Sequence, residues 1–327
     1  MAGALVLLRM AAAGFALALL PSGNAMSLRP SDLAPIAGIV GAEIEAGRIP
    51  GAVVEIGQGE AVVYRGAFGY RELEPRRVAM TPGTIFDLAS LTKAVATAVA
   101  IMQLSERGRV ELDAPAVRYL PAFGRSGKDR ITIRDLLTHY SGLPADLDLS
   151  HEWKGRAAAL GMIEAQTPQY PPGTHYHYSD INFEVLGEIV RRVSGLTLDT
   201  YCQARIFGPL GMRRTAFRPR PAWRSRMAPT LAAGGKLRLG LVHDPTAERM
   251  GGVAGHAGLF STADDLAIFA RMLLDGGRSG KSRILTARSI AEVTAPQSPQ
   301  GATHPRGLGW DLAAPLASNR EQLLPVG

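Results

Sequence analysis

The sequence predicts an α+β fold in which a block of helices interrupts a set of strands. Two apolar runs, 51–57 and 61–68, flank a Gly-rich turn at 57–60, which is typical of a β-hairpin. From Ser90 to about residue 220 the pattern is mostly helical, with long connections interrupted by proline. A lone hairpin is marginally stable, so we expect it to belong to a larger sheet.

The N-terminus carries the features of an export signal. Arg9 precedes an apolar run at 10–20, and small residues at 21–25 suit cleavage after Ala25. The run is too short to span a bilayer comfortably. We therefore expect a signal peptide over 1–25, one domain over 26–327, and a periplasmic or secreted location. The alternative is translation that begins at Met26.

Several helices follow from apolar spacing and end signals. The stretch Ser31-Asp32 precedes apolar positions at helical spacing up to residue 44, and an apolar run at 94–104 ends at Glu106-Arg107-Gly108. Asp264-Asp265 precedes the last clear helical pattern, which Gly276-Gly277 closes. Further helices are predicted over 182–193 and 198–207.

Composition excludes some classes of partner. Lys and Arg number 36 against 29 Asp and Glu, a formal charge of +7, but the Arg residues are scattered and lack interleaved aromatic residues. We therefore expect no nucleic-acid partner. The single cysteine, Cys202, cannot form an internal disulfide and lies in an apolar setting, so we expect it in the core.

The most informative pair is Ser90 and Lys93. Three residues apart at a helix start, they share one face, so the amine can reach the hydroxyl. A desolvated lysine can take the proton of a serine nucleophile. The unpaired backbone N–H groups in the first turn of a helix stabilise negative charge that develops near them. The alternative is an ordinary helix start with an exposed lysine.

A second cluster lies around Tyr178. A tyrosine in the turn before a helix, close to Lys93, could relay the serine proton to a leaving group. The alternative for Tyr178 is a half-buried aromatic residue at a helix entry. We interpret His139, before a Ser-Gly-Leu-Pro turn, as a structural histidine.

Together these motifs resemble the serine β-lactamase and penicillin-binding-protein superfamily, on its class C, carboxypeptidase and esterase side. The resemblance covers roughly 32–312 and implies an antiparallel sheet flanked by helices plus a helical lobe. It implies that Ser90 is the nucleophile, Lys93 its activating partner, and Tyr178 the proposed base and proton shuttle, and it leaves open which of Lys93 and Tyr178 is the acylation base. The motifs that carry it are Phe86-Asp87-Leu88-Ala89-Ser90-Leu91-Thr92-Lys93, Leu136-Leu137-Thr138-His139-Tyr140-Ser141-Gly142-Leu143-Pro144, Pro172-Gly173-Thr174, Tyr178-Ser179-Asp180, Ile206-Phe207-Gly208-Pro209-Leu210-Gly211-Met212 and Gly251-Gly252-Val253-Ala254-Gly255-His256-Ala257-Gly258-Leu259-Phe260-Ser261-Thr262.

Two positions match the family pattern incompletely. Asp180 stands where the Tyr-x-Asn motif has an amide, so a hydrogen bond to Lys93 or substrate would become a charge interaction. His256-Ala257-Gly258 resembles the third motif, Lys-Thr-Gly or His-Thr-Gly, but similar sequences have this Gly-rich turn as a separate feature. We treat Asp180 and His256 as candidate substrate-binding residues.

The third motif is expected after Gly307-Leu308-Gly309-Trp310, about where the sequence ends at Gly327. We therefore expect the last sheet strands to be missing and hypothesise a C-terminally truncated product. Reading the downstream DNA in all frames tests this.

The function implied by the resemblance is a serine hydrolase that works through an acyl-enzyme on an amide or ester. A D-Ala-D-Ala peptide, a β-lactam and a small ester all remain open as substrates, as does the oligomeric state. The alternative is a catalytically impaired or non-catalytic protein of the same fold that binds peptidoglycan or has a regulatory role. We expect no cofactor and no metal, because His175 and His177 lack a spaced third ligand.

Overall fold

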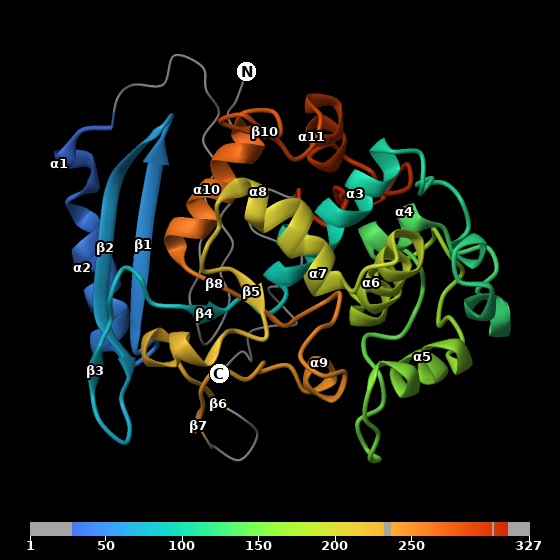
Figure 1. Ribbon diagram of the computed structural model, residues 1–327, viewed down its shortest axis with the longest axis horizontal. Coiled ribbons are helices and arrows are strands. Elements are labelled where there is room, and N and C mark those ends of the chain that lie inside the picture. Colours follow the sequence, from blue (N-terminus) through green and yellow to red (C-terminus); the bar gives the residue numbers. More distant parts are fainter. Residues whose placement is uncertain (1–27, 232–236, 303, 313–327) are drawn as a thin grey trace.

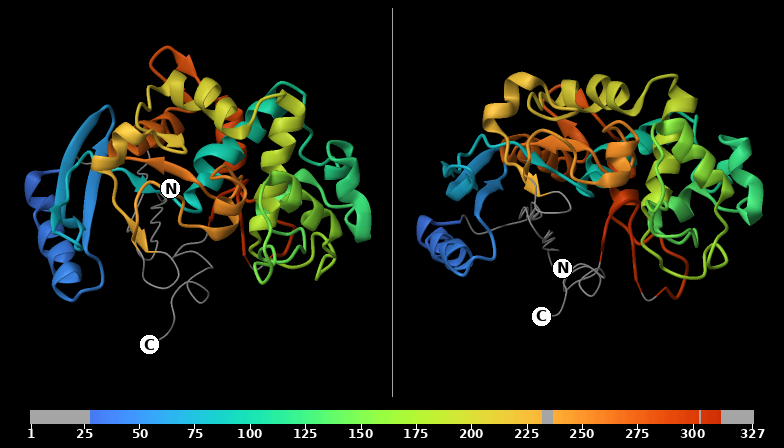
Figure 2. Two further views of the ribbon diagram at one scale, coloured as in Figure 1. Left: turned by 60° about the horizontal axis from the view of Figure 1, so that its bottom comes forward. Right: turned by 90° about the horizontal axis from the view of Figure 1, so that it is seen from below.

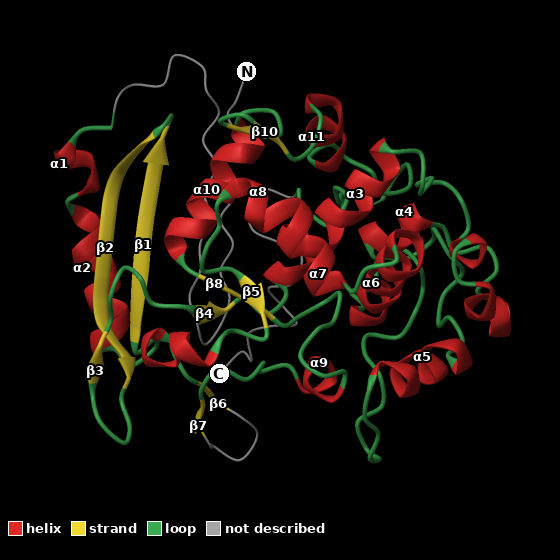
Figure 3. Cartoon of the chain, in the orientation of Figure 1, coloured by secondary structure: helices red, strands yellow, loops and turns green. Residues whose placement is uncertain are grey.

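The computed structural model describes residues 28–231, 237–302 and 304–312. Its helices and short antiparallel sheets confirm the predicted α+β class (Figure 3). The expected signal peptide over 1–25 lies outside the described residues. No helix among the described residues has both the length and the apolar character needed to cross a membrane.

The predicted hairpin opens the first sheet. Strands β1 (Gly51–Gln58) and β2 (Ala61–Glu72) pair antiparallel, and Gln58 opposite Ala61 leaves a two-residue turn whose Gly59 has a φ of +55°. Strand β3 (Val78–Ala79) pairs with the far end of β2. This pairing explains why β2 runs past the predicted end at residue 68.

Helices cover this first sheet. Helix α2 (Pro35–Glu45), which follows the short α1 (Pro30–Leu33), contacts β1 and β2, and α10 (Ala263–Leu274) contacts β1 (Figure 1). Both helices begin ahead of the residues that the sequence marks as their starts. The chain is helical from Pro30, ahead of Ser31-Asp32, and the hydroxyl of Thr262 caps α10 by accepting from the Asp265 N–H at 3.2 Å.

A second sheet brings distant parts of the chain together. Strand β8 (Leu259–Ser261) lies between β4 (Phe86–Asp87) and β5 (Ala216–Phe217), antiparallel to both. The Leu88 N–H continues the ladder by donating to the Leu259 carbonyl at 2.8 Å. The segments just before Ser90 and just after His256 are therefore held side by side.

The helical block forms the core behind Ser90. The predicted helix at 94–104 begins as a π turn, η1 (Lys93–Thr97), and continues as α3 (Ala98–Glu106), whose residues up to Leu104 are all buried. Helix α6 (Asp180–Ser194) packs against both, and α4 (Ile133–Thr138) against α6. The block and the first sheet lie on opposite sides of the second sheet (Figure 2).

The predicted helix at 198–207 is likewise divided, into α7 (Leu198–Cys202) and a π turn, η4 (Gln203–Phe207). Cys202 is fully buried in the core, as predicted. The remaining elements are η2 (Ala116–Arg118), η3 (Pro121–Gly127), α5 (Arg156–Ala165), α8 (Gly208–Leu210), η5 (Pro221–Arg226), β6 (Thr230–Leu231), β7 (Leu237–Arg238), α9 (Pro245–Arg249), β9 (Arg278–Ser279), β10 (Ser282–Arg283) and α11 (Ala287–Val293).

Candidate active site

Ser90 lies in a tight turn between β4 and the helix that starts at Leu91. Ala89 in this turn has a φ of +44°, a left-handed conformation that is unusual for a residue with a side chain. The turn is held by Asp87, whose carboxylate accepts from the Ala89 N–H at 2.8 Å and from the His243 N–H at 2.7 Å. Ser90 itself remains partly exposed, so a substrate can reach its hydroxyl.

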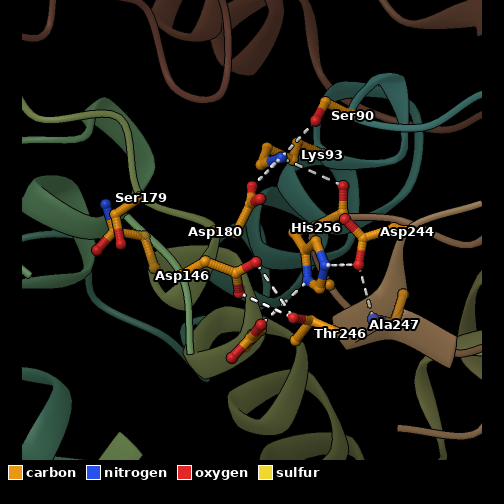
Figure 4. Close-up of polar contacts among 12 residues, drawn as sticks. Ser90, Lys93, Asp146, Ser179, Asp180, Asp244, Thr246, Ala247 and His256 are labelled. Atoms are coloured by element: carbon orange, nitrogen blue, oxygen red, sulfur yellow. Dashed lines mark hydrogen bonds and ion pairs between the residues drawn. The ribbon is translucent and has the colours of Figure 1, made fainter. Parts of the chain in front are cut away.

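The ammonium of Lys93 is the centre of the site. It donates to the Ser90 hydroxyl at 2.8 Å and to the His256 carbonyl at 3.3 Å, and forms an ion pair with Asp180 at 2.6 Å (Figure 4). Burial alone would lower the pKa of Lys93, but the charge of Asp180 and the Tyr178 phenol outweigh it and raise the pKa. Lys93 is therefore an ammonium in the free protein at neutral pH.

Tyr178 completes the group that the sequence predicts. The Lys93 ammonium lies 4.9 Å from the centroid of the Tyr178 ring, within the range of a cation–π contact. Ser90 and Tyr178, separated by a long stretch of sequence, thus both contact Lys93. The structure brings the three predicted residues together.

His139 supports Tyr178 from the helical block. The two rings stack with centroids 4.3 Å apart and planes at 25°. The Nδ1 atom of His139 accepts from the Ser179 N–H at 3.1 Å, and burial together with nearby cations lowers the pKa of His139 well below its ordinary value. A neutral His139 therefore fixes the backbone and the ring of the segment that carries Tyr178.

Asp180 begins α6 and faces Lys93. Its N–H donates to the Ala145 carbonyl at 2.6 Å, and its carboxylate forms the ion pair already described. The sequence predicts a charge interaction at this position where the family pattern has an amide, and the structure shows that interaction with Lys93.

His256 is placed differently from our expectation of a substrate contact. Its imidazole is fully buried below Lys93, with Nε2 2.9 Å from an Asp244 carboxylate oxygen and Nδ1 3.4 Å from a Glu184 carboxylate oxygen (Figure 4). The segment that carries it lies between η1 and α6, with Gly255 against Thr97 and Phe183, and the imidazole has no exposed surface. Only the backbone carbonyl of His256 reaches the site.

The carboxylates around His256 were not predicted. Glu184 lies inside α6, where it looks like an ordinary polar helix position, and Asp244 is the N-cap of α9, accepting from the Ala247 N–H at 2.7 Å. Asp146 adds a further acid through its hydrogen bonds to Thr246. The only sequence signal was the proximity of Asp244 to His256, because the other contacts depend on tertiary packing.

The chemistry of this cluster favours charge pairing. Ligand atoms of Asp180, Asp244 and His256 lie within 4.8 Å of one another, a spacing that a metal ion could use. However, the Lys93 ammonium already contacts Asp180. Burial lowers the pKa of His256, but the hydrogen bond to Asp244 and the charges of the surrounding carboxylates raise it to about 9. A metal ion would have to displace this proton before the imidazole could bind it.

Comparison with known proteins agrees with this geometry. The model of the Beta-lactamase family matches residues 36–319. A protein of Salmonella schwarzengrund (strain CVM19633), provisionally named a D-alanyl-D-alanine carboxypeptidase, is 32% identical over an alignment of 286 residues that covers 76% of this chain and 65% of that protein. The chain thus spans about two thirds of the length of the curated relatives it matches.

Two solved structures share the fold. A β-lactamase from Sulfitobacter sp. EE-36 has a TM-score of 0.71 at 26% identity, covering 90% of this chain and 78% of that one. An octameric penicillin-binding protein homologue from Pyrococcus abyssi has a TM-score of 0.69 at 25% identity, covering 85% of this chain and 64% of that one. With its Ser90, Lys93 and Tyr178 gathered at one site, the chain belongs to the Beta-lactamase family.

Proposed function

We propose that the protein is an exported serine hydrolase that forms an acyl-enzyme on Ser90. The observation that carries this proposal is the 2.8 Å hydrogen bond between the Lys93 ammonium and the partly exposed Ser90 hydroxyl. A buried amine at this distance is a means of removing the serine proton that an ordinary surface serine lacks. Family membership supports hydrolase chemistry in general.

The proposed reaction begins when the Ser90 oxygen attacks the substrate carbonyl and its proton passes to the Lys93–Tyr178 pair. The pair then protonates the leaving amine or alcohol, and water releases the acyl group by the reverse route. Because Lys93 is an ammonium in the free protein, the pair must first lose a proton. We therefore treat Lys93 and Tyr178 as one coupled acid–base unit.

For the substrate we propose a peptide ending in D-Ala-D-Ala or a related cell-wall amide. The provisional name of the Salmonella relatives and the positive net charge of this chain support that class. A small ester and a β-lactam remain competitors that the same acyl-enzyme chemistry would accept.

Labelling with a fluorescent acylating probe tests the nucleophile. Ser90→Ala should abolish labelling and the burst of product from a chromogenic ester, whereas Ser150→Ala, at an exposed serine, should retain both. Labelling that persists in Ser90→Ala contradicts the assignment. Rates on an ester, a cephalosporin and a D-Ala-D-Ala peptide then rank the three substrates, and a wild-type protein without any burst favours the non-catalytic alternative.

A further inference from the structure

The proposed reaction leaves a buried set of charged groups without a role. We call Glu184, Asp244 and His256 the buried array, although Asp244 is only half-buried: the Nε2 of His256 is 2.9 Å from Asp244, and the array lies directly below Lys93 and Asp180. Burying charged groups is costly unless they are paired, so their place beneath the reacting groups calls for a reason.

The segment 254–258 that carries His256 is fixed on both sides. The Thr97 hydroxyl donates to the Gly255 carbonyl at 2.7 Å, and a Cβ on Gly255 would lie 1.8 Å from the Phe183 carbonyl oxygen. Packing this close leaves the segment no room to shift. The backbone carbonyl of His256, which accepts from Lys93, is therefore held as firmly as the helices on either side.

We propose that His256 is a positioning residue for acylation: held between Asp244 and Glu184, it fixes the carbonyl that receives the Lys93 ammonium and offsets the negative charge facing Lys93. This inference rests on the proposed function, because it concerns the proton that the Lys93–Tyr178 pair takes from Ser90.

The charges around His256 come from every element that packs on it. Asp244 faces it from the start of α9, Glu184 and Asp180 from α6, Asp146 from the loop before α5, and Lys93 from η1. They are not equivalent, because the pKa of Glu184 is raised to about 8, mainly by burial, whereas the pKa of Asp244, despite burial, is lowered to about 2 by His256. At neutral pH the buried array therefore holds one positive charge on His256 and one negative charge on Asp244.

This balance has a direct effect on Lys93. If His256 lost its charge, Asp244 and Asp180 would act on Lys93 without compensation, and opposite charges hold an ammonium more firmly in its protonated form. Removal of the Ser90 proton would become slower. Removing the charge of Asp244 as well would restore the balance.

The test uses two variants of the full chain on a chromogenic ester. His256→Gln should lower kcat roughly tenfold or more at pH 7 and leave KM within about twofold of wild type. The pH at which kcat rises should shift to a higher value. The double variant His256→Gln with Asp244→Asn should recover most of kcat and return the profile towards wild type. Asn at 244 can still cap α9, so the second change adds no loss of that helix.

A purely structural role predicts the opposite order, because each lost contact would add to the damage. A double variant slower than His256→Gln, or a single variant with unchanged kcat and pH profile, overturns the proposal. So does loss of wild-type activity on chelation that a divalent metal restores, since the cluster would then be a metal site.

Should His256→Gln fail to fold, ¹⁵N NMR of wild-type histidine side chains decides the question. Of the two fully buried imidazoles among the described residues, His256 should carry protons on both nitrogens at pH 7.5 and His139 on one. A neutral His256 overturns the proposal. A wild type with no burst on any substrate contradicts the proposed function instead, and the NMR result stands apart from it.

Discussion

Two fully buried histidines lie next to the Lys93–Tyr178 pair, His139 against Tyr178 and His256 below Lys93, and their surroundings differ. His139 is packed against the rings of Tyr178 and Phe183, with centroids 4.3 and 5.2 Å away, and the nearby charges are positive. His256 is packed between carboxylates. Burial and nearby cations lower the pKa of His139. The pKa of His256 is raised to about 9, because the effect of the carboxylates outweighs that of burial.

The difference shows that burial alone does not set the charge of a histidine in this protein. Both imidazoles are equally hidden from solvent, so the neighbouring side chains decide. A neutral ring suits His139, which stacks on an aromatic ring and accepts a backbone hydrogen bond. A charged ring suits His256, which balances buried acids below Lys93.

The largest expected effect comes from filling the space beside His256. In Gly255→Ala the new Cβ would lie 1.8 Å from a backbone oxygen that cannot move, so we expect a loss of more than about 4 kcal/mol of unfolding free energy, or no folding. Gly38→Ala in α2, where a Cβ meets nothing within 4 Å, should instead stabilise by about 0.5–1 kcal/mol. Urea unfolding of both variants measures this. Equal stability of the two would show that the segment 254–258 is not tightly held.

The pH dependence of stability separates the two histidines. The stabilisation from His256 is full below pH 6.5 and is lost as pH rises through about 9, on the order of 3 kcal/mol. The pKa of Glu184 is raised from 4.5 to about 8, so Glu184 also makes the protein less stable as pH rises from 4.5 to about 8. His139 acts in the opposite direction, because its lowered pKa costs stability as pH falls below 6.5.

Urea unfolding across pH 5 to 10 checks these signs. His256→Gln should flatten the alkaline decline, and His139→Asn should flatten the acidic one. If His256→Gln keeps the full alkaline decline, His256 is not the group that titrates there.

A smaller effect is expected on the Tyr178 side. His139→Asn keeps a residue that tolerates the φ of +62° but removes the stacked ring, so we expect roughly a tenfold loss of kcat from a poorly placed Tyr178. The pH profile should keep its position, unlike that of His256→Gln. His175→Asn, at an exposed histidine, is the control and should stay within about twofold of wild type in ester hydrolysis. A normal kcat in His139→Asn would mean that the stacking does not position Tyr178.

The smallest effect should come from Glu184→Gln. Glu188, one turn further along α6, pairs with Arg156, Arg191 and Arg192 at 2.7–3.0 Å, and despite burial these arginines lower its pKa. At pH 6 a glutamine resembles the protonated Glu184, so we expect Glu184→Gln to change the free energy of unfolding by no more than about 0.5 kcal/mol. Glu188→Gln should lower it by about 1–3 kcal/mol. Thermal melts compare them, and similar losses at pH 6 would mean that Glu184 is ionised.

Much of the fold and the Ser90–Lys93 pair could be predicted from sequence because their signals are local. Two apolar runs around a Gly-rich turn marked β1 and β2, and the Ser90–Lys93 spacing needed only one helical turn, whereas the role of Tyr178 was implied by the resemblance to a family. The π turn at Lys93–Thr97 could not be predicted, because an apolar run is compatible with either helical period. The contacts of His256 with Glu184 and of His139 with Tyr178 arise only when α6 docks on the segments beside it.

The π turn has a consequence for the direction of Lys93. Here the Ala98 N–H bonds to the carbonyl five residues earlier, as if one residue had been inserted into an ordinary helix. Deleting a single residue between positions 94 and 97 would remove this insertion, and with 3.6 residues per turn it would rotate Lys93 by about 100° around the axis of α3. Ser90, on the same side of the deletion, would turn with Lys93, but the ammonium would lose its alignment with Asp180 and with the His256 carbonyl, which come from other elements. The phase of one helix, and not only its composition, thus determines whether Lys93 meets these two partners.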